Sequence, residues 1–246
     1  MESYNDFAEF YDSLMINAEY KKRAEYILRL FNKLNHNMGL TLDLACGTGN
    51  LTLELAKAGV DIYGIDGSEE MLSQAINKSA QQGLNILFLC QKMQEIDLYG
   101  TIDTCVCTLD SINHMTDIKD VQKTFDRVSL FMNKGGYFLF DLNTIYKHRE
   151  ILCNNIFVYD TEDVYCVWQN SLKENNLVEI DLDFFIPEDE VYFRASEHFE
   201  ERAYSDEEIT AMLNKAGFEK IALYGEMTFD SPKDTEQRVI YVAQKI

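Results

Sequence analysis

The sequence has little of what breaks regular structure, since only two of its 246 residues are proline. Hydrophobic residues make up 46% of the chain and aromatic residues 12%, far from the composition of chains that stay disordered. We therefore expect a compact globular protein. A chain of this length is sufficient for one large α/β domain, or for a core domain with an inserted subdomain.

The signatures of metal-binding, disulfide-bonded and membrane proteins are also missing. The six cysteines form no Cys-x-x-Cys pair and four of them lie in apolar runs, so we expect buried, reduced thiols and no metal site. No apolar stretch reaches the roughly 18 residues of a membrane span, and residues 1–14 alternate charged with aromatic side chains, unlike a signal peptide. The prediction is a cytoplasmic protein without a membrane partner, and we expect a monomer or a homodimer.

Positive charge is scarce. Lysine and arginine total 22 against 42 aspartate and glutamate residues, which gives a formal net charge of −20. Such a charge repels a polyanion along its whole approach, so we expect no nucleic-acid partner. The acidic excess can attract a cationic or amine substrate, but we prefer the simpler interpretation, a solvated face that keeps the chain soluble, and use the charge only to exclude partners.

The first 150 residues alternate between short apolar runs and amphipathic stretches. Asn37 and Gly39 end the first amphipathic stretch, and the next apolar run begins directly after them. Repeated strand–helix units predict a doubly wound, mostly parallel sheet with helices on both faces. We expect strands at 41–44, 61–65, 86–90, 104–109 and 136–141, and helices at 18–34, 50–57, 69–79 and 119–130.

The pattern changes near residue 151, where four strand-like runs with turn residues between them follow one another, at 157–159, 165–170, 177–185 and 191–201. We expect residues 151–202 to form an inserted antiparallel β subdomain that acts as a lid or substrate-binding surface. Residues 203–246 begin with a capping box at Ser205 and end with strands at 219–224 and 238–243. We expect these two strands to complete a seven-stranded sheet with the strands of residues 1–150. Residues 1–150 comprise an N-terminal cap and the α/β core.

A loop of small residues follows the first strand, in the sequence Asp43-Leu-Ala-Cys-Gly-Thr-Gly49. Small residues let a ligand lie against the backbone, and the following helix offers free N–H groups to it. A phosphate-binding loop of the Walker type is excluded, because Asn50 stands where that motif needs lysine. Thr52, in place of a third glycine, weakens the case for a dinucleotide.

The second strand ends in an acid, Asp66, which lies 19 residues after Gly47. A carboxylate at this place accepts hydrogen bonds from both ribose hydroxyls of an adenosine that lies across the strand ends. The two signals together favour an adenosine without phosphates.

These motifs, with Gly64-Ile-Asp-Gly-Ser68 and Phe140-Asp-Leu-Asn143, resemble in order those of class I S-adenosylmethionine-dependent methyltransferases, over nearly the whole chain. The resemblance implies a Rossmann-like methyltransferase fold and S-adenosyl-L-methionine as cofactor. It implies that the loop cradles the methionine portion and ribose, that Asp66 holds the ribose hydroxyls and that Met71 packs near the adenine. The implied cofactor-binding residues are Tyr11, Asp43, Ala45, Cys46, Gly47, Thr48, Gly49, Asp66, Gly67, Ser68, Met71, Gln91, Lys92, Met93, Leu109 and Asp110.

Lys92 is a departure from this family, which usually has an acid there in contact with the adenine amine. Lysine cannot accept a hydrogen bond from an amino group. Either Gln91 takes over the contact or the backbone around Met93 does. Ala45 stands where the first glycine of the loop usually lies, and it is still small.

Candidate acceptor-binding residues follow the fourth strand, where the family's cofactor meets its substrate. Asp110 and His114 are the candidate catalytic groups, with His114 as a general base or a substrate ligand. A polar loop that caps the next helix and a structural histidine are the alternatives. The candidate substrate-binding residues are Tyr4, Asn113, Trp168, His198 and Arg202.

The sequence therefore predicts an S-adenosylmethionine-dependent methyltransferase that moves a methyl group to nitrogen or oxygen of a small molecule. Its opening segment and its insertion are similar to those of N-methyltransferases of amino sugars and glycine. Two alternatives stay open. One is a non-catalytic nucleoside-binding scaffold or regulatory module, and the other is an NAD-dependent oxidoreductase.

Overall fold

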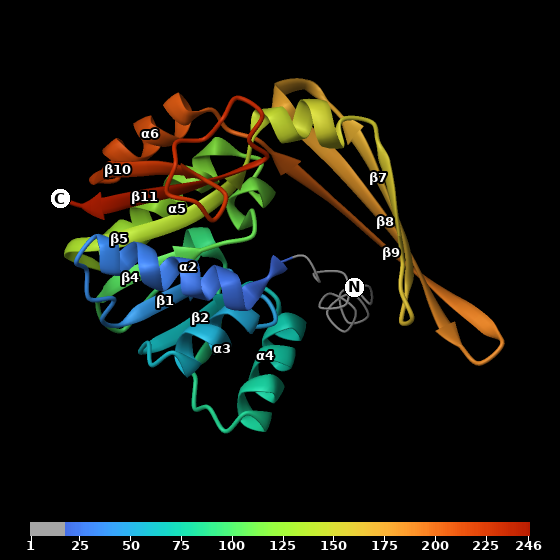
Figure 1. Ribbon diagram of the computed structural model, residues 1–246, viewed down its shortest axis with the longest axis horizontal. Helices are drawn as coiled ribbons and strands as arrows, with labels where there is room; N and C mark the ends of the chain where they lie inside the picture. The colour runs from blue at the N-terminus through green and yellow to red at the C-terminus, as the bar shows by residue number, and fades with distance from the viewer. Residues whose placement is uncertain (1–17) are drawn as a thin grey trace.

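The computed structural model describes residues 18–246, which form two β-sheets (Figure 1). The larger sheet has seven strands in the order β3-β2-β1-β4-β5-β11-β10. Its strands are β1 (Thr41–Leu44), β2 (Ile62–Asp66), β3 (Phe88–Cys90), β4 (Ile102–Cys107), β5 (Met132–Asn143), β10 (Phe218–Gly225) and β11 (Arg238–Lys245). Strands β1 to β5 pair in parallel, and β11 pairs antiparallel with both β5 and β10.

Helices cover both faces of this sheet. On one face, α2 (Tyr20–Lys33) and α3 (Asn50–Lys57) bury apolar side chains against β4, β5 and β11. On the other face lie α5 (Ile118–Phe131) and α6 (Asp206–Lys215), whose apolar stripes join the second core cluster. Helix α4 (Glu69–Gln81) packs against β2 and β3. The predicted fold class, a doubly wound and mostly parallel seven-stranded α/β sheet, is confirmed.

The second sheet is antiparallel, in the order β6-β7-β8-β9, and extends from the core as an arm (Figure 1). Its strands are β6 (Ile156–Asp160), β7 (Tyr165–Leu172), β8 (Leu177–Glu188) and β9 (Val191–Arg202). Apolar side chains alternate with polar ones along β8, so that Val178, Ile180 and Leu182 share one buried face. The antiparallel sheet expected in this stretch is present.

Strand and helix ends differ from the sequence prediction by a few residues. Strand β8 continues to Glu188 through Pro187, because at this end β8 pairs with β9 alone and one backbone edge needs no N–H donor. Strand β5 begins at Met132, which pairs with Ile102 ahead of a bulge. The π-helix η4 (Lys147–Leu152), which precedes the second sheet, was not predicted.

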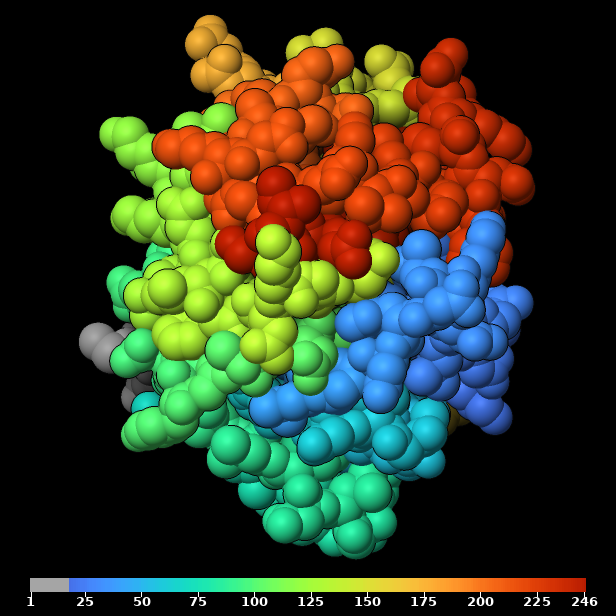
Figure 2. Space-filling model, turned by 90° about the vertical axis from the view of Figure 1, so that its left-hand side faces the viewer, coloured from blue at the N-terminus to red at the C-terminus, as the bar shows by residue number. Residues whose placement is uncertain are grey.

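The chain's last strand, β11, ends on the face of the core away from the second sheet. In Figure 2 the dark red end of β11 lies in the middle of this face, beside the yellow-green start of β5. The pairing of Gln244 with Tyr137 joins the two strands there. Within residues 18–246, no helix has both the length and the apolar character that crossing a membrane requires.

Candidate functional site

The loop after β1 is held in an unusual backbone conformation. Ala45, Gly47 and Gly49 have φ angles of 58°, 53° and 78°, all in the left-handed region. A Cβ on Gly49 would lie 2.8 Å from the Cβ of Ala75, so glycine lets α3 start close to α4. A Cβ on Gly47 would meet no described atom within 4 Å, which leaves room for a ligand against the backbone.

Asp66 closes this loop from the end of β2. Its Oδ2 accepts the N–H of Gly47 at 2.8 Å and its Oδ1 accepts the N–H of Ser68 at 2.9 Å. Burial raises the pKa of Asp66, although the N–H donors from Ser68, Gly47 and Gly67 oppose that rise. Each carboxylate oxygen has a second lone pair, so Asp66 keeps the capacity to accept from ribose hydroxyls.

Asp43 lies beneath the loop and is buried. Its Oδ2 accepts the hydroxyl of Thr52 at 2.6 Å. Burial raises the pKa of Asp43 to about 7, the Thr52 hydrogen bond opposes this, and the nearby Asp66 adds to it. Thr52, which stands where a dinucleotide motif has its third glycine, therefore serves as the hydrogen-bond donor to Asp43.

A cavity opens between the ends of β1 and β4. It is lined by side chains and backbone from the β1 loop and from the loop after β4, together with the start of α2: Tyr20, Asp43, Ala45, Cys46, Gly47, Thr48, Leu51, Thr108, Leu109 and Ser111. Burial raises the pKa of Cys46 well above its ordinary value, which keeps the thiol protonated. The open backbone at Gly47 and the carboxylate of Asp66 fit the ribose and methionine portions of an adenosyl ligand.

The predicted adenine end lies around β3 and α4. Ser68 caps α4 by accepting the N–H of Met71, whose side chain is buried. The side chain of Gln91 accepts the N–H of Asp97 at 2.7 Å and donates to its carbonyl at 3.2 Å, so it holds its own loop. Lys92 is exposed, and Met93 is half-buried against the core.

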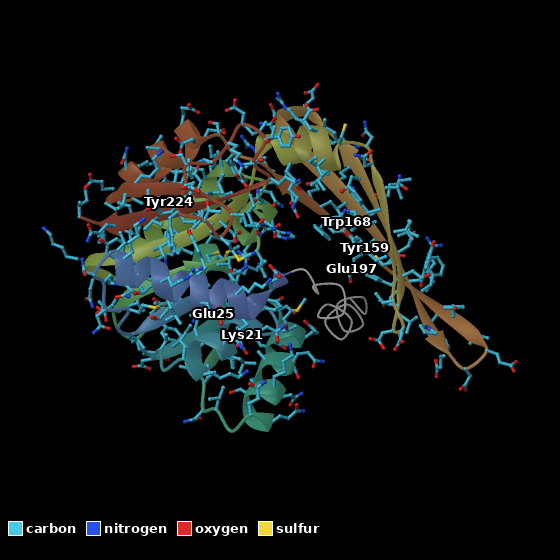
Figure 3. All side chains as sticks on the ribbon, viewed as in Figure 1. Lys21, Glu25, Tyr159, Trp168, Glu197 and Tyr224 are labelled. Carbon is cyan, nitrogen blue, oxygen red and sulfur yellow. The ribbon has the colours of Figure 1, made fainter. Side chains whose placement is uncertain are left out.

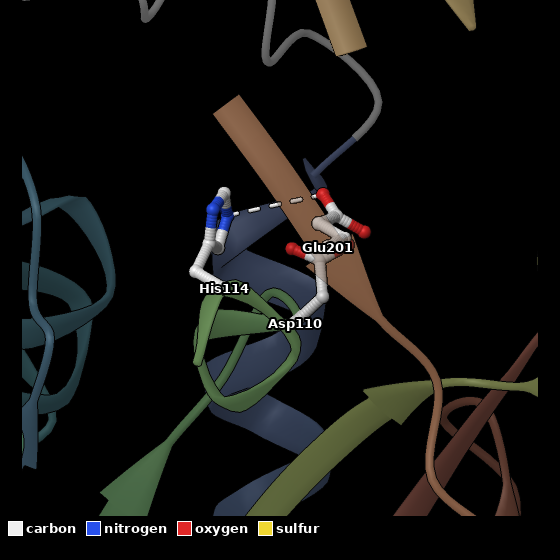
Figure 4. Close-up of side chains that lie close together, drawn as sticks. All are labelled: Asp110, His114 and Glu201. Atoms are coloured by element: carbon white, nitrogen blue, oxygen red, sulfur yellow. Dashed lines mark ion pairs between the residues drawn. The ribbon is translucent and has the colours of Figure 1, made fainter. Parts of the chain in front are cut away.

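Asp110, His114 and Glu201 form a cluster beside this cavity (Figure 4). One ligand-type atom from each lies within 4.8 Å of the others, and His114 Nε2 lies 3.9 Å from Glu201 Oε1. Glu201 is buried, and its Oε2 accepts from Asn143 Nδ2 at 3.0 Å. A histidine and two carboxylates are also a donor set for a divalent cation, but Arg238, 2.6 Å from Asp110 Oδ2, opposes a cation at that residue.

Asp110 is ionised by its surroundings. Burial alone would raise its pKa, but Arg238, Lys147 and His114 outweigh burial and hold the pKa of Asp110 well below its ordinary value. Its Oδ2 also accepts from Asn143 Nδ2 at 2.6 Å. Asp110 therefore enters the site as a fixed negative charge rather than as a proton carrier.

The second sheet supplies the opposite wall. Phe199 and Glu201 share one face of β9, and the ring of Phe199 lies 5.1 Å from that of His114. Glu197 belongs to the same face by the two-residue period of a strand. Figure 3 labels Trp168, Tyr159 and Glu197 on this sheet. Trp168 is half-buried and donates from Nε1 to Asn170 Oδ1 at 2.7 Å.

Three predicted substrate-binding residues are engaged elsewhere. Both amide atoms of Asn113 bond to backbone, donating to the carbonyls of Asn143 and Arg202 and accepting the N–H of Asn143. His198 lies on the outer face of β9 and pairs with Asp181. Arg202 pairs with Glu208 and lies over the ring of Tyr204. Tyr4 and Tyr11 lie outside the described residues.

Sequence reasoning missed Glu201, Asn143 and Arg238. The signal for Glu201 was present, because Phe199 marks the inward face of its strand and Glu201 has the same parity, whereas His198 and Arg202 have the other. Asn143 belongs to a motif that was noticed only as a family feature. Arg238 carried no signal, since its partners are distant in sequence.

Comparisons with known proteins agree with this geometry. A family model described as a methyltransferase domain matches residues 41–136. YqeM of Bacillus subtilis strain 168, described as a candidate methyltransferase, is 35% identical over 244 residues, which cover 98% of this chain and 97% of that protein. A glycine/sarcosine N-methyltransferase of Aphanothece halophytica is 23% identical over 250 residues, covering 99% and 90%.

Solved structures give the same result. The crystal structure of an S-adenosylmethionine-dependent methyltransferase from Clostridium acetobutylicum ATCC 824 superposes with a TM-score of 0.90 at 36% identity, covering 98% of both chains. CalS10, an amino pentose methyltransferase from Micromonospora echinaspora bound to S-adenosylmethionine, shares the fold with a TM-score of 0.77 at 16% identity, covering 96% of both chains. The chain is an enzyme that uses S-adenosylmethionine, and it belongs to the class I S-adenosylmethionine-dependent methyltransferases.

Proposed function

We propose that this methyltransferase transfers the methyl group to the nitrogen of a small amine that binds between the core and the inner face of the second sheet. The observation that carries the proposal is the Asp110–His114–Glu201 cluster. Asp110 of this cluster directly follows Leu109 in the sequence. Both Leu109 and Ser111 line the cavity between the ends of β1 and β4, which we assign to the cofactor and call the cofactor cavity. An acceptor against this cluster would be adjacent to the cofactor.

The charge of this wall favours an amine. Glu197 and Glu201 are both buried on β9, whereas the charge of Asp110 is balanced by Arg238. Buried carboxylates attract an ammonium group strongly because little water screens them. The half-buried Trp168 and Tyr159 add aromatic faces, which also bind cations.

Proton handling fits the same acceptor. Bound S-adenosylmethionine would supply a methyl group on a sulfonium, and the chain's task is to hold the nitrogen lone pair in line with it and to exclude water. Transfer forms an N–C bond and breaks the C–S bond, whose electron pair stays on sulfur. The nitrogen must first lose its ammonium proton, either to water or to His114, which can pass it toward Glu201.

Two relatives support this acceptor class by their names, a glycine/sarcosine N-methyltransferase and an amino pentose methyltransferase. The first is named as an N-methyltransferase of glycine and sarcosine, and the second as a methyltransferase of an amino pentose. We include Asp43, Ala45, Cys46, Gly47, Thr48, Gly49 and Asp66 in the proposed cofactor site, with Gly67, Ser68 and Met71 beside it.

Calorimetric titration with S-adenosylhomocysteine tests the cofactor site. We expect Asp66→Ala to weaken binding roughly ten- to hundredfold, since hydrogen bonds to a charged group contribute about 1.5–3 kcal/mol. Asp61→Ala is the matched control, because Asp61 is an exposed carboxylate next to the opposite end of β2. Equal binding by Asp66→Ala and wild type would remove Asp66 from the site.

A panel of small amines and matched hydroxyl compounds tests the acceptor, with formation of S-adenosylhomocysteine as the readout. We expect turnover with amines, and at least a tenfold loss of kcat/KM in Glu201→Gln. Glu200→Gln is the control, since Glu200 is exposed on the opposite face of the same strand. Turnover with hydroxyl compounds alone would refute the amine proposal.

A further inference from the structure

Two consecutive residues without glycine's freedom adopt left-handed backbone after β4. Leu109 has φ 60° and Asp110 has φ 55°. This conformation costs an L-residue about 1–2 kcal/mol, and such strain persists only where neighbouring groups hold it. Leu109 lines the cofactor cavity and Asp110 belongs to the acceptor cluster, so the strained pair connects the two halves of the site.

One carboxylate accepts both N–H groups of this pair. Asp141, near the end of β5, accepts the N–H of Leu109 on Oδ2 at 2.9 Å and that of Asp110 on Oδ1 at 2.7 Å. Asp141 is buried, and hydrogen bonds to a buried anion are stronger than neutral ones. Two such bonds, at about 1.5–3 kcal/mol each, are enough to offset the strain of both residues.

Two arginines hold Asp141 in turn. Arg238 Nη1 lies 3.1 Å from Oδ1, and Arg23 Nη1 lies 3.1 Å from Oδ2. The other terminal nitrogen of Arg238, Nη2, lies 2.6 Å from Oδ2 of Asp110. Arg238 therefore connects Asp110 to the carboxylate that accepts the Asp110 N–H, while Arg23 connects α2 to the same point.

The network has an outer end at Glu226. Its Oε1 lies 3.0 Å from Arg23 Nη2 and 3.6 Å from Arg238 Nε, and its side chain is 37% exposed. Glu226 contacts both arginines but, among the described residues, forms no hydrogen bond with Leu109 or Asp110. It therefore balances charge without holding the loop.

We propose that Asp141 and Arg238 are positioning residues of this methyltransferase, which hold Leu109 and Asp110 in the left-handed conformation that aligns the cofactor cavity with the acceptor cluster. The inference rests on the proposed function for the roles of Leu109 and Asp110. Neither Asp141 nor Arg238 needs to touch cofactor or acceptor, since each acts through the loop.

Arg238→Lys is the primary test, because lysine keeps the charge but has no planar fork to reach Asp110 and Asp141 together. Arg194→Lys is the matched control, an arginine whose Nε and Nη2 both bond to Asp183 on the outer face of the second sheet. The readouts are the dissociation constant of S-adenosylhomocysteine by calorimetry and the hydrogen-exchange rates of the Leu109 and Asp110 amides by NMR. Asp141→Asn is the second variant.

We expect Arg238→Lys to raise the dissociation constant about tenfold and to accelerate exchange at Leu109 and Asp110 at least tenfold relative to the amides of β4, with Arg194→Lys unchanged. A merely structural role would lower the melting temperature and leave both readouts as in wild type, which would overturn the inference. Wild type that does not bind S-adenosylhomocysteine would contradict the proposed function, and the two exchange rates would still decide the positioning roles. If Asp141→Asn does not fold, Arg238→Lys decides alone.

Discussion

Single residues at the strand ends combine burial with charge in this protein. Asp43 is the clearest case, because its carboxylate is buried under the cofactor loop with the Thr52 hydroxyl as donor. Its pKa of about 7 in the folded protein lies above the roughly 3.9 of an unfolded chain. The protonated form therefore stabilises the folded state, and this contribution is lost as pH rises from about 4 through about 7.

Asp43→Asn removes this dependence, because asparagine cannot ionise yet still accepts the Thr52 hydroxyl. We expect the unfolding free energy of the variant, relative to that of wild type, to increase between pH 4 and pH 7 by at most about 4 kcal/mol. Urea denaturation followed by circular dichroism at several pH values measures the difference. Asp61→Asn, at an exposed carboxylate, controls for general charge effects, and a difference that stays constant with pH would contradict the assignment.

The sequence was informative about residues whose role depends on neighbours in the chain. The glycine-rich loop and Asp66 were located by spacing alone, and the structure brings Asp66 to Gly47. The left-handed φ of Ala45 explains why glycine is usual there. The roles of Arg238 and Asp141 could not be predicted, although Asp141 belongs to the motif at 140–143, because their partners come from α2, the loop after β4, β5 and β11 and meet only in the folded chain.

Among the elements, helix α6 begins where a local sequence motif predicts a helix start. Ser205 accepts the N–H of Glu208 through its hydroxyl, and Glu208 accepts the N–H of Ser205, as the predicted capping box requires. The helix then packs its apolar stripe on the core and partners Arg202 through Glu208. From local patterns in the sequence, the first residues of α2, α3, α4 and α5 were predicted to within two residues of their positions in the structure.

Ser205→Ala tests the cap. Loss of the side-chain acceptor leaves a helix N–H without its partner, so we expect the unfolding free energy to fall by about 1 kcal/mol. Urea denaturation with an unchanged m-value is the measurement. Ser73→Ala is the control, since Ser73 is exposed within α4 and its hydroxyl caps no helix end. A loss no larger than that of the control would show that the capping box contributes little.

Other elements depended on tertiary pairing that no local pattern reports. The π-helix Lys147–Leu152 is anchored through His148 Nδ1, which lies 2.9 Å from the carbonyl oxygen of Asn176, and helices of this kind often occur at functional sites. The start of β5 reads as a turn, through Asn133, Lys134 and Gly135, and becomes strand because Met132 pairs with Ile102. In both places long-range contacts outweigh local preference.

At the scale of the whole molecule, the described chain has separate cores for its two sheets. Two clusters cover the faces of the seven-stranded sheet, and a third lies on the inner face of the second sheet. The cofactor cavity is lined by residues of the first sheet and its helices, whereas Glu197 and Glu201 come from the second. We propose that residues 151–202 form the inserted acceptor-binding unit and that the rest of the described chain forms the cofactor-binding unit.

Ile180→Ala tests this division. Ile180 is buried in the core of the second sheet, where removing a side chain of this size costs about 2–5 kcal/mol. If the two cores are separate, the variant loses stability in its urea transition and binds S-adenosylhomocysteine with the wild-type dissociation constant. Ile156→Ala, at a position that is 60% exposed in β6, should leave both quantities unchanged. If cofactor affinity instead falls in parallel with stability, the two cores are not separate. The second sheet would then support the cofactor cavity, although none of its residues lines that cavity.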